Sequence, residues 1–173
     1  MVSSSTLVLL PSEKGRGVYT LDDIPEGSPI LEFAGPRVDR GHVLTALRTT
    51  GHDGFLQIDH DEFIGLSGGF DDFINHSCDP NCGLNFDGDA PRLISLEYIP
   101  EGSELTFDYA CSQENFPFRF ACSCGAPDCR RIVGDFRELP AKIRARYLRM
   151  GLVPPFLSEE LHVEMPRLAV GAK

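Results

Sequence analysis

Two cysteine-bearing segments, far apart in the chain, constrain how this sequence can fold. The first is residues 75–82, Asn-His-Ser-Cys-Asp-Pro-Asn-Cys, which combine hydrogen-bonding groups and thiols in a turn. The second holds Cys122, Cys124 and Cys129, whose C-x-C-x4-C spacing offers three thiolates to one metal ion. Structural zinc takes four thiolate or imidazole ligands, so the chain must supply one more. The candidates for this fourth ligand are Cys78, Cys82, Cys111 and a histidine.

The alternative for the same thiols is burial as small hydrophobic side chains, which is common for free cysteines. Three thiols within residues 122–129 favour metal binding instead, and Gly125 and Pro127 help the backbone to bend around an ion. The segment has little apolar mass, so a zinc ion that contributes on the order of 10 kcal/mol would supply much of its stability. We therefore predict one structural zinc ion (Zn2+).

The composition predicts one folded domain built of many short elements. The 173 residues are enough to bury a core, and 17 glycines and 13 prolines favour turns over long helices. Residues 7–10 are too short and lack the basic lead-in for a secretory signal, and no apolar run is long enough for a membrane span. Six cysteines without such a signal indicate a reducing compartment and a protein that is not secreted.

The net charge of −10 argues against direct binding to a nucleic-acid backbone, which requires a basic surface. An acidic surface favours a cationic partner such as a peptide rich in lysine and arginine, through electrostatic steering. The alternative is that the charge only keeps the protein soluble. Acidic pairs such as Asp71-Asp72 are interpreted as solvated turns, because no calcium-binding spacing accompanies them.

Turn residues divide the first part of the chain into predicted strands. Residues 39–50 carry apolar side chains four apart and predict a short helix. In residues 92–99 the alternation puts Ile94, Leu96 and Tyr98 on one face of a strand. The predicted strands are residues 7–10, 18–21, 29–33, 55–58, 62–66, 92–99 and 104–109, with a hairpin between 55–58 and 62–66.

The C-terminal part predicts the best helix of the chain, over residues 137–150. Gly151 and then Pro154-Pro155 are expected to end it. Its apolar stripe consists of Leu139, Ile143, Tyr147 and Met150, and its cations lie mostly off that stripe.

Four motifs occur in one order along the chain. They are Gly15-x-Gly17, residues 75–81, the Glu-Leu-Thr-Phe-Asp-Tyr segment at 104–109, and the three thiols at 122–129. Together they resemble the SET-domain protein-lysine methyltransferases that carry a post-SET zinc segment. The likeness covers about residues 5–135.

This resemblance implies a mainly β fold with short helices. It consists of several small sheets and a pseudoknot in which the Asn-His segment lies beside the later tyrosine strand, followed here by a C-terminal helix. The implied divisions are a SET domain at residues 5–110, a post-SET zinc segment at 111–135, and a C-terminal helix and tail at 136–173.

The resemblance also implies which residues bind the cofactor S-adenosylmethionine and the metal. Tyr109 would stand at the methyl-transfer channel and touch the cofactor. Cys78 would be the fourth zinc ligand, with Cys82 and Cys111 as spare thiols. The implied cofactor-binding residues are Lys14, Gly15, Arg16, Gly17, Asn75, His76 and Tyr109, and the implied zinc ligands are Cys78, Cys122, Cys124 and Cys129.

The implied catalytic residues are Tyr109, Phe107 and Phe33. A phenylalanine at position 107 resembles family members that reach di- or trimethyllysine, because no hydroxyl holds a water that crowds the amine. Phe33 departs from the family, which commonly has a tyrosine there. Arg16 departs too, where an aromatic side chain is frequent. Phe73 is a further candidate for the channel wall, with the core as the alternative.

The resemblance therefore implies methyl transfer from S-adenosylmethionine to a lysine of a basic protein, with a histone H3 tail as the leading substrate. The protein would be nuclear in a eukaryote and otherwise cytoplasmic. Phe33 and Arg16 motivate a second hypothesis, an enzyme acting on a non-histone protein or a small molecule. A third is a binding-only protein with a degenerate site. Tyr109, Asn75 and His76 argue against the third.

Overall fold

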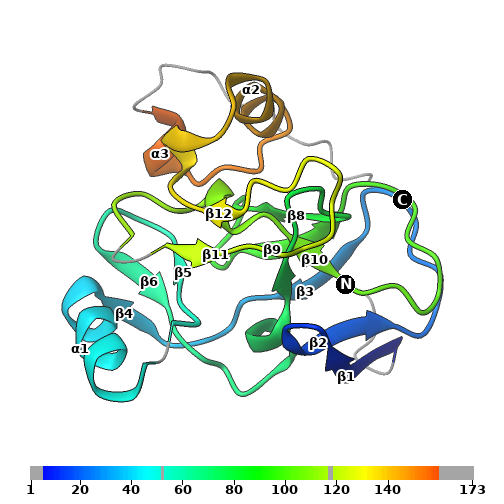
Figure 1. The fold of residues 1–173 in the computed structure, drawn as a ribbon, viewed down its shortest axis with the longest axis horizontal. Coiled ribbons are helices and arrows are strands. Elements are labelled where there is room, and N and C mark those ends of the chain that lie inside the picture. Colours follow the sequence, from blue (N-terminus) through cyan, green and yellow to red (C-terminus); the bar gives the residue numbers. More distant parts are fainter. Residues whose placement is uncertain (1–5, 52, 117–118, 160–173) are drawn as a thin grey trace.

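The computed structural model describes residues 6–51, 53–116 and 119–159, and it consists of small sheets joined by turns (Figure 1). The first strands are β1 (Leu7–Ser12), β2 (Gly15–Thr20), β3 (Pro29–Glu32), β4 (Arg37–Asp39), β5 (Leu56–Gln57) and β6 (Glu62–Ile64). The later strands are β7 (Asn75–His76), β8 (Cys82–Asn85), β9 (Arg92–Ser95), β10 (Thr106–Phe107), β11 (Phe120–Ala121) and β12 (Ile132–Val133). The helices are α1 (Arg40–Thr50), α2 (Ala141–Arg149) and α3 (Pro155–Glu159), with one-turn helices at Phe70–Phe73, Tyr109–Cys111 and Phe136–Glu138.

Most of the sheets are antiparallel. β1 pairs with β2, β11 pairs with β12, and two sheets have three strands in the orders β3-β9-β8 and β4-β6-β5. The predicted hairpin is present, since β5 and β6 pair antiparallel. The predicted mainly β fold of several small sheets with short helices is therefore confirmed.

The exception is a parallel pair between β7 and β10, in which Asn75 lies opposite Thr106 and His76 opposite Phe107. The Asn-His segment thus lies beside the strand that precedes Tyr109, as the resemblance implied. Because the strands are parallel, the residues that follow both of them leave the sheet at the same edge. The pair therefore brings the turn that begins at Tyr109 next to the cysteine-bearing turn after His76.

The main hydrophobic core lies under these sheets and continues to the C-terminal helices. A smaller cluster between α1 and the β4-β6-β5 sheet is centred on Val43 and Phe63. The fully buried apolar side chains of the main core include Val18, Ile24, Ile30, Leu84, Leu93, Leu105, Phe136, Leu152 and Leu157.

The helix α1 follows its prediction closely. Asp39 is its N-cap, and its carboxylate accepts a hydrogen bond from the backbone N–H of His42 at 2.8 Å. Gly51 ends the helix with a left-handed backbone (φ 69°). These local signals require no tertiary information, which is why the sequence pattern finds both ends.

Two of the predicted strands are shorter in the structure. β9 ends at Ser95, because the Ser95 hydroxyl donates to the Pro25 carbonyl at 2.6 Å and its N–H to the Ser28 carbonyl at 3.0 Å. The buried face is that of Leu93 and Ser95, whereas Tyr98 is 56% exposed. The predicted strand at 104–109 shrinks to β10 (Thr106–Phe107).

The predicted helix at 137–150 is also divided. A one-turn helix at Phe136–Glu138 comes first, and α2 begins only after Pro140, whose ring lacks the N–H that a continuous helix needs. Pro155 does not only end a helix but begins α3, where proline is favoured in the first turn. Within the described part of the chain, none of the helices has the length and apolar character that crossing a membrane requires.

Candidate active site and metal centre

A cavity of about 390 Å³ lies beside the parallel β7–β10 pair. This volume is in the range of small-molecule binding sites. Side chains from the N-terminal hairpin, the two parallel strands and the segment around β11 meet there. Of the residues with a predicted role, the cavity is lined by Lys14, Phe33, Asn75, His76, Phe107, Tyr109 and Cys122.

One wall of the cavity is aromatic. The ring of Phe107 lies 4.8 Å from that of Tyr109 and 5.8 Å from that of Phe33, in tilted and edge-on contacts. Phe120 extends the wall, with its ring centre 6.1 Å from that of Tyr109. Sequence analysis did not assign Phe120 to the site, although its alternation with Phe116 was visible. Phe73, the fourth candidate for this wall, is not among the lining residues.

Tyr109 is held at both its backbone and its hydroxyl. The hydroxyl donates to the carbonyl of Ile74 at 2.8 Å, and the backbone N–H donates to His76 Nδ1 at 3.2 Å. Burial raises the pKa of Tyr109 well above its ordinary value, and the carboxylates of Asp53 and Glu104 add to the effect. The phenol therefore stays protonated and acts as a fixed donor, not as a base.

Asn75 ties the N-terminal hairpin to β7. Its amide Nδ2 lies 2.9 Å from the carbonyl oxygen of Arg16, 2.7 Å from Glu104 Oε1 and 3.2 Å from Ser12 Oγ. A Cβ at position 17 would lie 2.9 Å from Asn75 Nδ2 and would overlap the carboxylate of Glu104. A side chain there would therefore displace the side chains of Glu104 and Asn75 and disturb the bond between them.

The other predicted cofactor residues of the hairpin differ in position. The ammonium group of Lys14 donates to the carbonyl of His76 and faces the cavity. Gly15 has a φ of 106°, which favours glycine, but Gly15, Arg16 and Gly17 are not among the cavity-lining residues. The guanidinium of Arg16 instead lies 4.2 Å above the ring centre of Phe73, in a cation–π contact.

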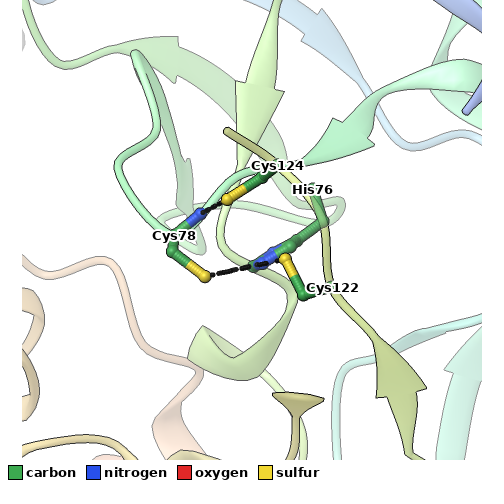
Figure 2. Close-up of side chains that lie close together, drawn as sticks. All are labelled: His76, Cys78, Cys122 and Cys124. Carbon is green, nitrogen blue, oxygen red and sulfur yellow. Dashed lines mark hydrogen bonds between the residues drawn. The ribbon is translucent and has the colours of Figure 1, made fainter. Parts of the chain in front are cut away.

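The cysteine-bearing segments meet beside the cavity. Cys122 Sγ lies 3.8 Å from Cys78 Sγ and 3.7 Å from Cys129 Sγ. A zinc–sulfur distance of about 2.3 Å in a tetrahedral site corresponds to about 3.8 Å between sulfurs. The ligand atoms of His76, Cys78, Cys122 and Cys124 all lie within 4.8 Å of one another. Figure 2 shows these four side chains lying close together. Cys129 is outside this group of four, although its Sγ is near that of Cys122. The separation of the Cys78 and Cys122 sulfurs suits one zinc ion.

Five side chains are thus candidates for four ligand positions, and the hydrogen bonds of His76 bear on the choice among them. Burial, together with the charges of Arg130 and Lys14, lowers the pKa of His76 to about 3, so the ring is neutral. Its Nδ1 accepts the N–H of Tyr109, which leaves the proton on Nε2. Nε2 lies 3.4 Å from Cys78 Sγ and is therefore suited to donate to that sulfur rather than to bind metal.

Backbone N–H groups donate hydrogen bonds to two of the same sulfurs. The N–H of Arg130 donates to Cys78 Sγ and that of Cys78 to Cys124 Sγ, both at 3.4 Å. Burial alone would raise the pKa of Cys124, but backbone N–H donors from Cys78 and Ala126 bring it down to about 6. Donors of this kind stabilise the thiolate form that metal binding requires. Cys82 and Cys111 are buried in the hydrophobic core and are not part of this cluster.

A buried carboxylate next to the site received no role in the sequence analysis, although it lies in the motif at 104–109. The Asp108 carboxylate accepts hydrogen bonds from Arg130 Nη2 at 2.6 Å, the Tyr147 hydroxyl at 3.0 Å and the Ala110 N–H at 3.2 Å. Asp108 is 2% exposed and directly precedes Tyr109. Tyr147 belonged to the predicted apolar stripe of the last helix, and nothing local distinguished its hydroxyl.

The chain is similar to several known proteins. It is 32% identical over 133 residues to "Histone-lysine N-methyltransferase ASHH2" of Arabidopsis thaliana, covering 70% of this chain and 8% of that protein. It is 30% identical over 149 residues to "Histone-lysine N-methyltransferase SETD2" of Homo sapiens, covering 80% of this chain and 6% of that protein. It is 29% identical over 171 residues to "Histone-lysine N-methyltransferase, H3 lysine-36 specific" of Candida albicans, covering 92% of this chain and 19% of that protein. The chain thus spans less than a fifth of the length of these relatives.

A solved structure and a family model are consistent with the similarity to these relatives. The crystal structure of KRYPTONITE in complex with mCHH DNA, H3(1-15) peptide and SAH has a TM-score of 0.59 at 28% identity. The match covers 74% of this chain and 29% of that one. The SET domain family model matches residues 15–110, more than half of the chain. The chain belongs to the SET domain family.

Proposed function

We propose that this protein transfers methyl groups from S-adenosylmethionine to the side chain of a lysine in a protein, with a histone H3 tail as the leading substrate. The observation that carries this proposal is the cavity beside β7 and β10. There, Asn75 and His76 meet the aromatic wall of Phe33, Phe107 and Tyr109. The similarity to histone-lysine methyltransferases and to a SAH-bound structure supports the same reaction and cofactor.

The main obstacle to this reaction is the charge on the acceptor amine. A free lysine has a pKa of about 10.4, so roughly one amine in a thousand is neutral at physiological pH, a cost of about 4 kcal/mol. The wall of Phe33 and Phe107 is apolar and would disfavour the charged ammonium, lowering its pKa. Tyr109 keeps its own proton, so it does not act as the base that removes the lysine proton.

The chain's other task is alignment, because methyl transfer is an in-line displacement. S-adenosylmethionine supplies an electrophilic methyl group on a sulfonium sulfur. Lys14, Asn75 and His76 would hold the cofactor, and Asn75 also fixes the backbone of β2 through Arg16. Tyr109, fixed by Ile74, would set the direction from which the amine approaches.

A basic peptide is the substrate that charge favours. Asp53, Asp71 and Asp72 line the cavity, and the whole chain carries a net charge of −10. Both features attract lysine- and arginine-rich tails and oppose direct contact with DNA phosphates. With a histone substrate, the protein would act in the nucleus of a eukaryotic cell.

We also propose one structural zinc ion held by Cys78, Cys122, Cys124 and Cys129. The sulfur separations of 3.8 and 3.7 Å around Cys122 support this set, and the neutral ring of His76 would donate to Cys78 from outside it. The ion would join the turn after β7 to the segment between β11 and β12. Because Cys122 also lines the cavity, this crosslink would hold one edge of the site.

A single assay separates this function from its rivals. S-adenosylmethionine labelled in its methyl group is offered with histones, with a cell lysate and with a small-molecule extract. Label in histone H3 supports the proposal. Label found only in lysate proteins or in small molecules would show that the enzyme methylates another acceptor and not histone H3. No binding of the cofactor by calorimetry would contradict enzymatic function altogether.

The cofactor assignment predicts a loss of affinity in Asn75→Ala. This change removes hydrogen bonds to Arg16 and Glu104, so the hairpin is no longer held against β7. We expect the Kd for S-adenosylmethionine to rise at least about tenfold, as the loss of a bond to a charged partner allows. Calorimetry measures the Kd. Asn85→Ala is the control, since the side chain of Asn85 is bonded to Asp87, just beyond its own strand. Equal affinity in both variants would exclude Asn75 from this role.

The cavity also predicts how far methylation proceeds. Phe107 presents no hydroxyl next to Tyr109, so the amine keeps room for further methyl groups. We expect wild-type protein to form di- or trimethyllysine and Phe107→Tyr to stop predominantly at monomethyllysine. Mass spectrometry of the product at long times and excess cofactor measures this. The control is Phe73→Tyr, which lies under Arg16 outside the cavity. Monomethyl product from the wild type would contradict the expectation.

A further inference from the structure

The C-terminal helices reach the candidate active site through one hydroxyl group. α2 and α3 lie in a separate layer above the sheets (Figure 1) and follow the residues 15–110 that match the SET domain. Yet Tyr147 of α2 is 3% exposed, and its hydroxyl donates to Asp108 Oδ2 at 3.0 Å. Asp108 is the neighbour of Tyr109 in the chain. The contact joins a segment outside the matched region to the tyrosine of the site.

The Asp108 carboxylate depends on this contact because water does not reach it. With 2% of its surface exposed, its oxygens must be satisfied by protein donors. Oδ1 accepts hydrogen bonds from Arg130 Nη2 and from the N–H of Ala110. Among the described residues, the donor to Oδ2 is the Tyr147 hydroxyl. Arg130 Nη1 is buried and makes no hydrogen bond within the same residues, so it does not share the bonding of Oδ2 in this structure.

The carboxylate in turn holds the backbone that carries Tyr109. Its bond to the N–H of Ala110 caps the one-turn helix that begins at Tyr109. His76 Nδ1 lies 3.6 Å from Asp108 Oδ1 and accepts the N–H of Tyr109. A shift of Asp108 would therefore move the backbone of Tyr109, and with it the N–H that His76 accepts. Small displacements of reacting groups reduce rates strongly, because alignment is most of the work.

We propose that Tyr147 is a positioning residue for methyl transfer, which makes α2 part of the functional unit. It acts through Asp108 and does not contact the cavity, since it is not among the lining residues. The inference rests on the proposed methyltransferase function for its kinetic consequence only. The structural link between Tyr147 and the backbone at Tyr109 is present without substrate or cofactor, so it can be measured in the absence of methyl transfer. The alternative is that Tyr147 only packs α2 against the core.

The test compares Tyr147→Phe, which removes the hydroxyl and keeps the ring, with Leu148→Val. Leu148 is the next residue of α2 and is also buried, but it packs only through apolar atoms. Amide hydrogen exchange at Tyr109 and Ala110 is measured on the resting protein. Methyl transfer is then measured well below both melting temperatures.

We expect exchange at Tyr109 and Ala110 to accelerate about tenfold in Tyr147→Phe, as loss of a bond to a carboxylate allows. We expect kcat to fall about tenfold, with KM for the peptide within about twofold, because alignment rather than substrate binding is lost. Leu148→Val should lower the melting temperature and leave both quantities unchanged.

Unchanged exchange at these two amides in Tyr147→Phe would overturn the proposal, and so would equal losses of kcat in the two variants. If the wild type transferred no methyl group, the proposed function would fail. The exchange data would still decide whether Tyr147 holds the backbone at Tyr109.

Discussion

Tyr109→Phe is expected to reduce kcat for methyl transfer by about a hundredfold or more, as misalignment of a reacting group does. The change removes the hydroxyl that donates to the carbonyl of Ile74 at 2.8 Å, directly before Asn75. The ring would remain against Phe107, so folding should be preserved. Initial rates with labelled cofactor measure the loss, and calorimetry shows whether the cofactor still binds.

Tyr98→Phe is the matched control. Tyr98 is 56% exposed and its hydroxyl is paired with Asp23, away from the cavity. It should retain wild-type kcat. A Tyr109→Phe variant that folds, binds the cofactor and transfers methyl groups at the wild-type rate would exclude Tyr109 from the reaction.

Cys124→Ser is expected to abolish stoichiometric zinc and to lower the melting temperature sharply. Structural zinc contributes on the order of 10 kcal/mol to small metal-dependent units, and the serine hydroxyl is a poor substitute for a thiolate. Methyl transfer should be lost too, because Cys122, at the same centre, lines the cavity. Elemental analysis and thermal unfolding measure the effect. Treatment of the wild type with a chelator should have the same result.

Two comparisons test the proposed ligand set. Cys82→Ala should keep one zinc per chain, since Cys82 is buried in the core outside the cluster. Cys129→Ser should lose the metal, whereas His76→Gln should keep it, because in the proposed set His76 donates to Cys78 and does not bind the ion. Metal retained in Cys129→Ser and lost in His76→Gln would reverse this assignment.

The parts of the fold that sequence analysis predicted are those with local signals or with several motifs in order. The Asp39 side chain caps the start of α1, and the left-handed backbone of Gly51 ends the helix. The pairing of β7 with β10 followed from the resemblance, not from periodicity. β9 was predicted too long, because the bonds that end it come from Ser28 and Pro25, far earlier in the chain.

The parts of the site that sequence analysis missed depend on tertiary contacts. Phe120 joins the aromatic wall only because β11 crosses next to Tyr109. The hydroxyl of Tyr147 looked like part of an apolar stripe, and its partner Asp108 lies 39 positions away in the chain. Spacing identified three thiols and the resemblance named Cys78 as the fourth ligand, but neither predicted that His76 would lie beside these sulfurs or accept the N–H of Tyr109.

The most direct test of the account is the chemical form of a methylated substrate. Histone H3 is incubated with the wild-type protein and S-adenosylmethionine, digested and analysed by tandem mass spectrometry, with Tyr109→Phe in parallel. The account predicts methyl groups on the side-chain nitrogen of a lysine, reaching the di- or trimethyl form, and little product from Tyr109→Phe. Unmodified lysines after long incubation with bound cofactor, or methyl groups on another kind of side chain, would contradict it.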